Sequence, residues 1–119
     1  AVQQGSFDLV VFIGHNGLMD FDLPKPVKAK NVTKVSECIV LCCKSESYFK
    51  SRIEAGGGKP ILLTQQLMYP GAFILLAVAN SWLDGKTIIE IRESAGEAYA
   101  LNQKISKKAG IGIFADLKK

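Results

Sequence analysis

The sequence predicts an α/β fold in which a mostly parallel sheet is flanked by helices. Three short apolar runs, at residues 8–13, 38–43 and 60–64, have the length and composition of buried strands. Segments with helical spacing follow the second and third runs, and strands that alternate with helices form parallel sheets. At 119 residues the chain has room for one modest core, so we expect a single domain over residues 1–119, or the C-terminal part of one.

The first strand is expected over residues 8–13, covered on both faces, and it ends at a turn-forming Gly-His-Asn-Gly tetrapeptide at residues 14–17. Residues 18–23 are expected to form a short edge piece. Two prolines then open a polar, basic stretch, so residues 25–34 are expected to be an exposed loop or a weak edge strand.

The second strand is expected over residues 38–43 and leads into a helix. Ser45 is a suitable N-cap, and apolar side chains recur at helical spacing within residues 47–55. Three glycines at residues 56–58 are expected to end this helix as a C-cap and hinge. They follow a helix and precede a strand, which is the wrong order for a strand–loop–helix phosphate cradle.

The remaining elements continue the alternation. A third strand at residues 60–64 precedes a helix over residues 70–83, which has a proline in its first turn. Thr87 is expected to cap a further amphipathic helix that closes near Gly110. Residues 111–117 are expected to form a last strand or a short tail.

Charge and hydropathy exclude two classes of partner. The formal net charge is +4, but the lysines are scattered, and the nearest cluster (Lys104, Lys107, Lys108) fits a solvated helix end. We therefore expect no nucleic acid partner. Residues 60–83 carry no charge, but polar residues and a proline interrupt them, so a strand and a buried helix explain them better than a membrane span.

The cysteines indicate a reducing compartment. Cys38, Cys42 and Cys43 are odd in number and crowded, unlike the spaced, even set of a disulfide framework. No signal peptide is visible, and we expect a cytoplasmic protein. The chain begins at Ala1 with a strand soon after, which indicates a processed product or a piece of a longer protein. His15 with the adjacent cysteines lacks the spacing of a zinc site, so no metal is expected.

The sequence places a base and a nucleophile just past two consecutive strands. His15 follows the first strand and Cys43 ends the second, and groups beyond the carboxyl ends of parallel strands share one edge of the sheet. A thiol acts as a nucleophile when a nearby base removes its proton, and His15 is the only histidine. Backbone N–H groups of Asn16 and Gly17, with that of Cys43, would then form an oxyanion hole.

A non-functional interpretation of the same residues stays open. Buried cysteine is a common core residue, and we expect Cys38 and Cys42 to be of that kind. A histidine in a glycine turn is often an ordinary loop residue.

These segments also resemble a known family. A strand ending in Gly-His-Asn-Gly, then Ile-Val-Leu-Cys-Cys-Lys-Ser, then Pro-Ile-Leu-Leu-Thr followed by a Pro-Gly-started apolar helix is similar to the caspase-like cysteine peptidases. That group includes caspases, gingipains and bacterial CHAT-type peptidases. The resemblance extends over residues 8–99 and implies a three-layer caspase-like fold. It places His15 as the catalytic base and Cys43 as the nucleophile, with Cys42 in that role if the register differs by one.

The resemblance also implies an activity. Peptide or protein substrates would be cleaved through a thioester intermediate, without a metal or organic cofactor. The substrate pocket would lie near Gln65, Gln66 and Tyr69. Two features depart from the family: Asn16 intervenes between the histidine and the glycine, and two opening strands are missing. The resemblance therefore requires an upstream segment, or a second copy in a homodimer, to complete the sheet.

Two other functions fit the same pattern. One is a non-enzymatic interaction or ligand-binding module of related fold, in which the His and Cys have no catalytic role. The other is an α/β enzyme that binds CoA, a nucleotide or an acyl group, which predicts a phosphate-sized pocket near Gly14 or Gly17.

Overall fold

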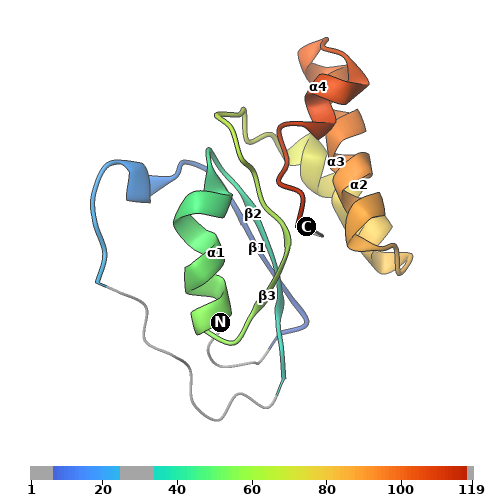
Figure 1. Ribbon diagram of the computed structural model, residues 1–119. Helices are drawn as coiled ribbons and strands as arrows, with labels where there is room; N and C mark the ends of the chain where they lie inside the picture. Colours follow the sequence, from blue (N-terminus) through green and yellow to red (C-terminus); the bar gives the residue numbers. More distant parts are fainter. Residues whose placement is uncertain (1–6, 25–33, 118–119) are drawn as a thin grey trace.

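The protein contains a parallel three-stranded sheet, as the sequence predicts. The computed structural model describes residues 7–24 and 34–117. Within them, β1 (Leu9–Ile13), β2 (Glu37–Leu41) and β3 (Lys59–Leu62) form a sheet of order β1-β2-β3, with both pairings parallel (Figure 1). The stretch expected to be a loop or weak strand lies almost entirely outside the described residues.

Helices cover the two faces of this sheet. Helix α1 (Ser45–Ala55) packs on one face, while α2 (Ala72–Leu83) and α3 (Ile88–Gln103) pack on the other (Figure 1). Helix α4 (Lys107–Ile111) lies against α3 at the end of the described chain. The expected α/β class with flanking helices is thereby confirmed.

Strand β2 is the centre of the molecule, because successive side chains of a strand point to opposite faces. Ile39 and Leu41 are fully buried against α2 and α3, whereas Cys38, Val40 and Cys42 are buried against α1. Both faces of β2 are therefore covered, as its unbroken apolar run predicts.

Strand β1 is less buried than its apolar sequence predicts. Its residues are half-buried, and the Phe12 side chain is 46 % exposed. Within the described residues β1 pairs with β2 alone, so it forms an edge of the sheet and has a neighbour on one side only. The run of apolar residues could not distinguish an edge strand from a central one.

The segment after β1 is helical rather than extended. Residues 18–23 were expected to form an edge piece, but Gly17–Met19 form a single 3₁₀ turn, η1. Asn16 caps this turn, with its side-chain oxygen accepting a hydrogen bond from Leu18 N at 3.0 Å. A local side-chain cap therefore replaces the expected strand.

The helix capped by Thr87 begins where the sequence predicts and ends earlier. Thr87 and Glu90 form a complete capping box, which confirms the expected start of α3. The prediction of one helix to Gly110 is wrong: Lys104 takes a left-handed conformation with φ 57°, and Ser106 caps the separate helix α4. The break lets α4 fold back onto α3, where a Cβ on Gly110 would lie 2.3 Å from the Gly96 carbonyl oxygen.

The start of α1 also differs in detail from the prediction. The N-cap is Lys44, in a left-handed conformation, and Ser45 is the first residue of the helix. The Ser45 hydroxyl does not cap the helix but donates to the Val40 carbonyl at 2.8 Å. Gly56 ends the helix as expected.

The C-terminal residues run beside the extension of β3. Thr64 and Phe114 form an isolated antiparallel bridge, and Ala115 N donates to the Leu63 carbonyl at 2.8 Å. The uncharged stretch at residues 60–83 contains β3 and α2. No helix in the described ranges is long and apolar enough to span a bilayer.

Candidate functional site

The loops that carry His15 and Cys43 lie side by side at the carboxyl end of the sheet. Ile13 of β1 is in register with Leu41 of β2, and each candidate residue lies two positions beyond its strand. The pairing continues one step further, because Gly14 N donates to the Leu41 carbonyl at 3.2 Å. The strands therefore deliver the two residues to the same edge, as predicted.

Asn16 links the two loops directly. Its side chain is fully buried, and Nδ2 donates to the Cys43 carbonyl at 2.7 Å while Oδ1 caps η1. Burying an amide is tolerated when both its donor and its acceptor are satisfied, as they are here. Asn16 thus connects the histidine loop to the cysteine loop through its side chain.

The His15 imidazole is exposed and is oriented by a carboxylate. Nε2 of His15 lies 2.7 Å from Oδ2 of Asp20, and the two side chains are 73 % and 65 % exposed. Solvent screens such a pair, so its contribution to stability is small. If Nε2 carries the proton in this hydrogen bond, Nδ1 is left as the basic nitrogen.

Asp20 is a further residue of the site that the sequence predictions do not include. The chain turns back at η1, where the Asp20 N–H donates to the Gly17 carbonyl, and this turn brings Asp20 to His15. An acid five residues after a histidine in a turn-forming stretch is the only sequence signal for this contact.

The Cys43 thiol is half-buried and hydrogen-bonded to the main chain of one residue. Its Sγ donates to the Met68 carbonyl at 3.4 Å and accepts from Met68 N at 3.3 Å. Within the described residues no hydrogen bond joins Cys43 to His15. The two side chains thus share one edge of the sheet, and each has its own polar partner.

Cys42 is a poor nucleophile in this environment. It is fully buried, and burial, followed by the neighbouring Cys43 charge, raises its pKa to about 11. Its thiol is therefore protonated at neutral pH. Burial likewise raises the pKa of Cys38. Both cysteines belong to the core on the α1 face, as expected from the sequence.

A buried polar pair holds the base of the cysteine loop. Thr64 Oγ1 donates to the Cys42 carbonyl and accepts from Ser45 N at 3.0 Å, while Thr64 N donates to Ser45 Oγ at 2.8 Å. Neither side chain is accessible to solvent. Because each polar atom is paired, this network orders the loop between β2 and α1, including Cys43.

The side chains expected to form a substrate pocket make their hydrogen bonds and ring contacts with other parts of the chain. Gln65 Nε2 and Gln66 Nε2 donate to the Gly112 carbonyl at 2.8 and 3.2 Å. The Tyr69 ring stacks on Phe73 with 6.2 Å between centroids, and Tyr69 N donates to the Tyr99 hydroxyl at 3.0 Å. These contacts connect the loop after β3 to α2, α3 and the end of α4.

An apolar pocket, which is not among the sequence predictions, lies next to His15. It has a volume of about 200 Å³, and it offers no Lys or Arg to a phosphate. The alternation within β1, which turns Phe12 and Val10 to the α1 face, is the sequence signal that could have located it. Its walls come from β1, η1, the following turn and α1: Phe12, His15, Gly17, Leu18, Phe21, Leu23 and Phe49.

The described residues contain no cluster of three or more His, Cys, Asp or Glu side chains placed to hold a metal ion.

Comparisons of the chain with models of protein families, with curated proteins and with solved structures found no match.

Proposed function

We propose that the protein is a cysteine peptidase of caspase-like type that cleaves peptide bonds through His15 and Cys43. One observation carries the proposal: the two residues occupy equivalent positions beyond adjacent parallel strands, and the buried Asn16 side chain ties their loops together at 2.7 Å. A base and a thiol at one edge of a sheet are the minimum needed for thiol-mediated acyl transfer.

The proposed reaction uses groups that the described chain contains. His15 takes the Cys43 thiol proton, the thiolate attacks the substrate carbonyl carbon, and the protonated imidazole then gives its proton to the leaving amine. Water hydrolyses the resulting thioester and releases the carboxylic acid. Met68 N donates a hydrogen bond to Sγ, and this hydrogen bond becomes charge-assisted when the thiolate forms.

Asp20 is a positioning residue in this proposal. It binds one ring nitrogen of His15 and so directs the other toward the reaction, which is the role of the third group in hydrolytic triads. The backbone N–H groups of Asn16 and Gly17 remain the proposed oxyanion donors.

We further propose a substrate class, the partners and a cellular location. The substrate is a peptide or protein, and its side chains would meet Gln65, Gln66 and Tyr69 or the apolar pocket beside His15. Neither a metal nor an organic cofactor takes part, and neither nucleic acid nor a membrane is a partner. Strand β1 would gain a neighbour from an upstream segment or from a second copy. The three free cysteines fit a cytoplasmic location.

A mechanism-based label tests the dyad. A peptidyl acyloxymethyl ketone alkylates a thiol that has an effective base, and mass spectrometry identifies the modified residue. We expect labelling at Cys43, loss of labelling in Cys43→Ala, and labelling slowed by about 100-fold or more in His15→Gln. Cys42→Ala is the matched control and should label like the wild type.

A second function, a non-enzymatic interaction module, is favoured by one observation. Both reactive groups already have partners, since His15 binds Asp20 and Cys43 binds the Met68 main chain. If Cys43 reacts with iodoacetamide but not with the ketone, or if His15→Gln labels at the wild-type rate, the peptidase proposal fails and the module is supported.

A further inference from the structure

We propose that a second site, at the amino ends of β2 and β3, binds a zwitterionic α-amino acid with an aliphatic side chain. This site is independent of the proposed peptidase function, because His15 and Cys43 lie at the opposite ends of the strands.

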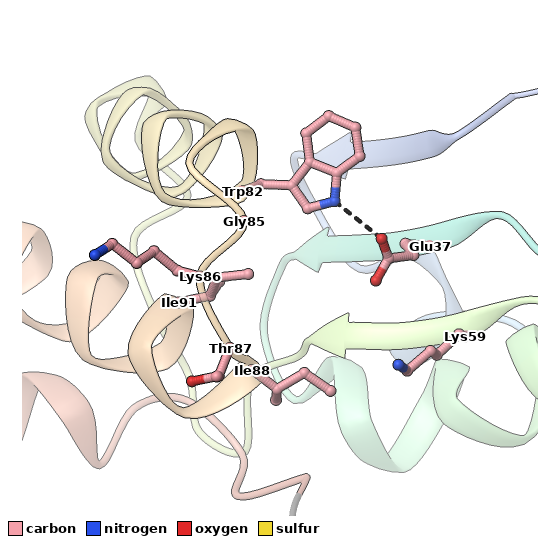
Figure 2. A pocket seen from close by; sticks show the side chains of 8 residues that line it. All are labelled: Glu37, Lys59, Trp82, Gly85, Lys86, Thr87, Ile88 and Ile91. Atoms are coloured by element: carbon pink, nitrogen blue, oxygen red, sulfur yellow. Dashed lines mark hydrogen bonds between the residues drawn. The ribbon is translucent and has the colours of Figure 1, made fainter.

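The site is a cavity of about 340 Å³ between the sheet and the turn that joins α2 to α3. Sites for small molecules have volumes of about 300–1,000 Å³, so this cavity suits a ligand at the small end of that range. Figure 2 shows the Glu37 carboxylate and the Lys59 ammonium facing this space from the beginnings of their strands.

Glu37 and Lys59 carry opposite charges and lie side by side, but they do not form an ion pair with each other. Glu37 and Lys59 are partners in the register of β2 and β3, where side chains on one face come within reach of each other. They nevertheless form no ion pair, and Lys59 Nζ has no partner among the described residues. A carboxylate and an ammonium therefore face one cavity with a space between them.

Trp82 explains why Glu37 does not turn to Lys59. The indole Nε1 donates to Oε1 of Glu37 at 3.1 Å, which holds the carboxylate on the α2 side of the cavity (Figure 2). Oε2 of Glu37 has no hydrogen bond to any described residue. The carboxylate is thus oriented, half-buried and left with one acceptor available.

Lys86 does not add a second cation to the cavity. Its side chain points away from Glu37 and Lys59 (Figure 2), and its ammonium lies 4.0 Å from the Glu90 carboxylate. Lys86 also lines the cavity, but with its ammonium directed away, Glu37 and Lys59 are the lining residues whose charged groups face this space.

This pair of charges selects the ligand class. Glu37 is half-buried and Lys59 is exposed, so a ligand with a single charge would pair with only one of them, whereas a zwitterion can pair with both. An α-amino acid supplies a carboxylate for Lys59 and an ammonium for Oε2 of Glu37. Ile88 and Ile91 form an apolar wall, which suits an aliphatic side chain.

The fluorescence of Trp82 provides a direct test. Trp82 is the only tryptophan of the chain, so its emission reports this cavity alone. Titration of the whole protein with L-leucine should change the emission saturably, with half-saturation at about 1 mM or below. N-acetyl-leucine lacks the ammonium and leucinamide lacks the carboxylate, and each should bind at least about tenfold more weakly.

Two variants should reproduce the effect of the analogues. Glu37→Gln keeps an oxygen that accepts the Trp82 N–H but removes the charge, and Lys59→Gln removes the ammonium. Each should weaken leucine binding by about tenfold or more. Glu54→Gln and Lys108→Gln change the same charges at exposed positions outside the cavity, and they should bind leucine like the wild type.

Several results would overturn the proposal. One is the lack of a saturable change at leucine concentrations up to about 10 mM, ten times the expected midpoint. Equal binding of leucine and its two blocked analogues would show that the charges play no part. Circular dichroism checks that Glu37→Gln and Lys59→Gln are folded, and unchanged binding in both folded variants would also refute the site.

Discussion

The two faces of β2 pack against cores of different composition. On the α2/α3 face, Ile39 and Leu41 join large side chains such as Ile74 and Phe114. On the α1 face, the buried cluster consists mainly of smaller side chains: Cys38, Val40, Cys42, Ile53, Leu63 and Ala115. Hydrophobic stabilisation grows with the apolar area removed from water, so the α2/α3 face contributes more to the stability of the fold.

This difference also separates two roles within one strand. The α2/α3 face joins the helices to the sheet, whereas the α1 face lies under the loop that presents Cys43, where Thr64 and Ser45 replace apolar contacts by hydrogen bonds. We therefore expect substitutions on the α2/α3 face to alter the free energy of unfolding most.

Leu41→Ala tests the difference between the two faces of β2, and it has the largest expected effect on stability. Leu41 is fully buried on the α2/α3 face, and its truncation leaves a cavity in the larger core. We expect the free energy of unfolding to fall by about 2–5 kcal/mol, measured by urea denaturation followed by circular dichroism. A loss below about 1 kcal/mol would show that this face is loosely packed.

A second test adds volume instead of removing it. A Cβ on Gly96 would lie 2.4 Å from Ile111 Cγ1 and 2.5 Å from its Cα, so Gly96→Ala forces α4 away from α3. We expect a destabilisation of about 1–3 kcal/mol.

Gly112→Ala is the matched control, because its new Cβ would meet only ordinary contacts at 3.4 and 3.5 Å. Equal stability of the Gly96 and Gly112 variants would contradict close packing of α3 and α4.

On the α1 face, Val40→Ala should have a smaller effect than Leu41→Ala. It removes two methyl groups from a buried side chain, at about 0.8 kcal/mol each, so we expect a loss of about 1.5 kcal/mol in the same urea experiment. If Val40→Ala destabilised the protein as much as Leu41→Ala, the proposed difference between the faces would be wrong.

The smallest expected effect on stability comes from Glu90, at the surface of the α2/α3 layer, and it depends on pH. The Thr87 backbone N–H, and then its hydroxyl, donate to the Glu90 carboxylate and hold its pKa below the usual 4.5. Because the pKa is lower in the folded state, the carboxylate stabilises α3 above the unfolded pKa. This contribution is lost as the pH falls through the folded value.

The unfolding free energies of wild type and Glu90→Gln should therefore differ at neutral pH and converge once the pH has fallen below the pKa of Glu90 in the folded state. Glu93→Gln removes a carboxylate from the same helix outside the capping box and serves as the control. A wild-type advantage over Glu90→Gln that persists unchanged in acid would mean that the charge of Glu90 is not responsible.

Part of the candidate site was accessible from the sequence. Strand length and the rule that reactive groups gather beyond the carboxyl ends of parallel strands were enough to place His15 and Cys43 at one edge. The partners of these residues were not predictable in the same way. Met68 binds Cys43 from 25 residues away, and Asn16 reaches Cys43 from 27 residues away, so only the packing of the loops brings them together.

The proposed amino acid site shows more clearly that partners from distant segments cannot be predicted from the sequence. Trp82, Glu37 and Lys59 come from three separate elements, and none of them belongs to a recognisable motif. Their relation depends on the register of two strands and on where the turn between two helices lands on the sheet.

Local chemistry determined the element types. The alternation of apolar strands and helices, the capping by Thr87 and the glycine after α1 act through near neighbours in the chain, so their patterns can be read from the amino acids alone.

Tertiary packing decided which strands lie at the edges of the sheet, where the last helix breaks and which polar side chains meet. Those outcomes depend on contacts between distant segments, whose free energies are summed only when the whole chain folds.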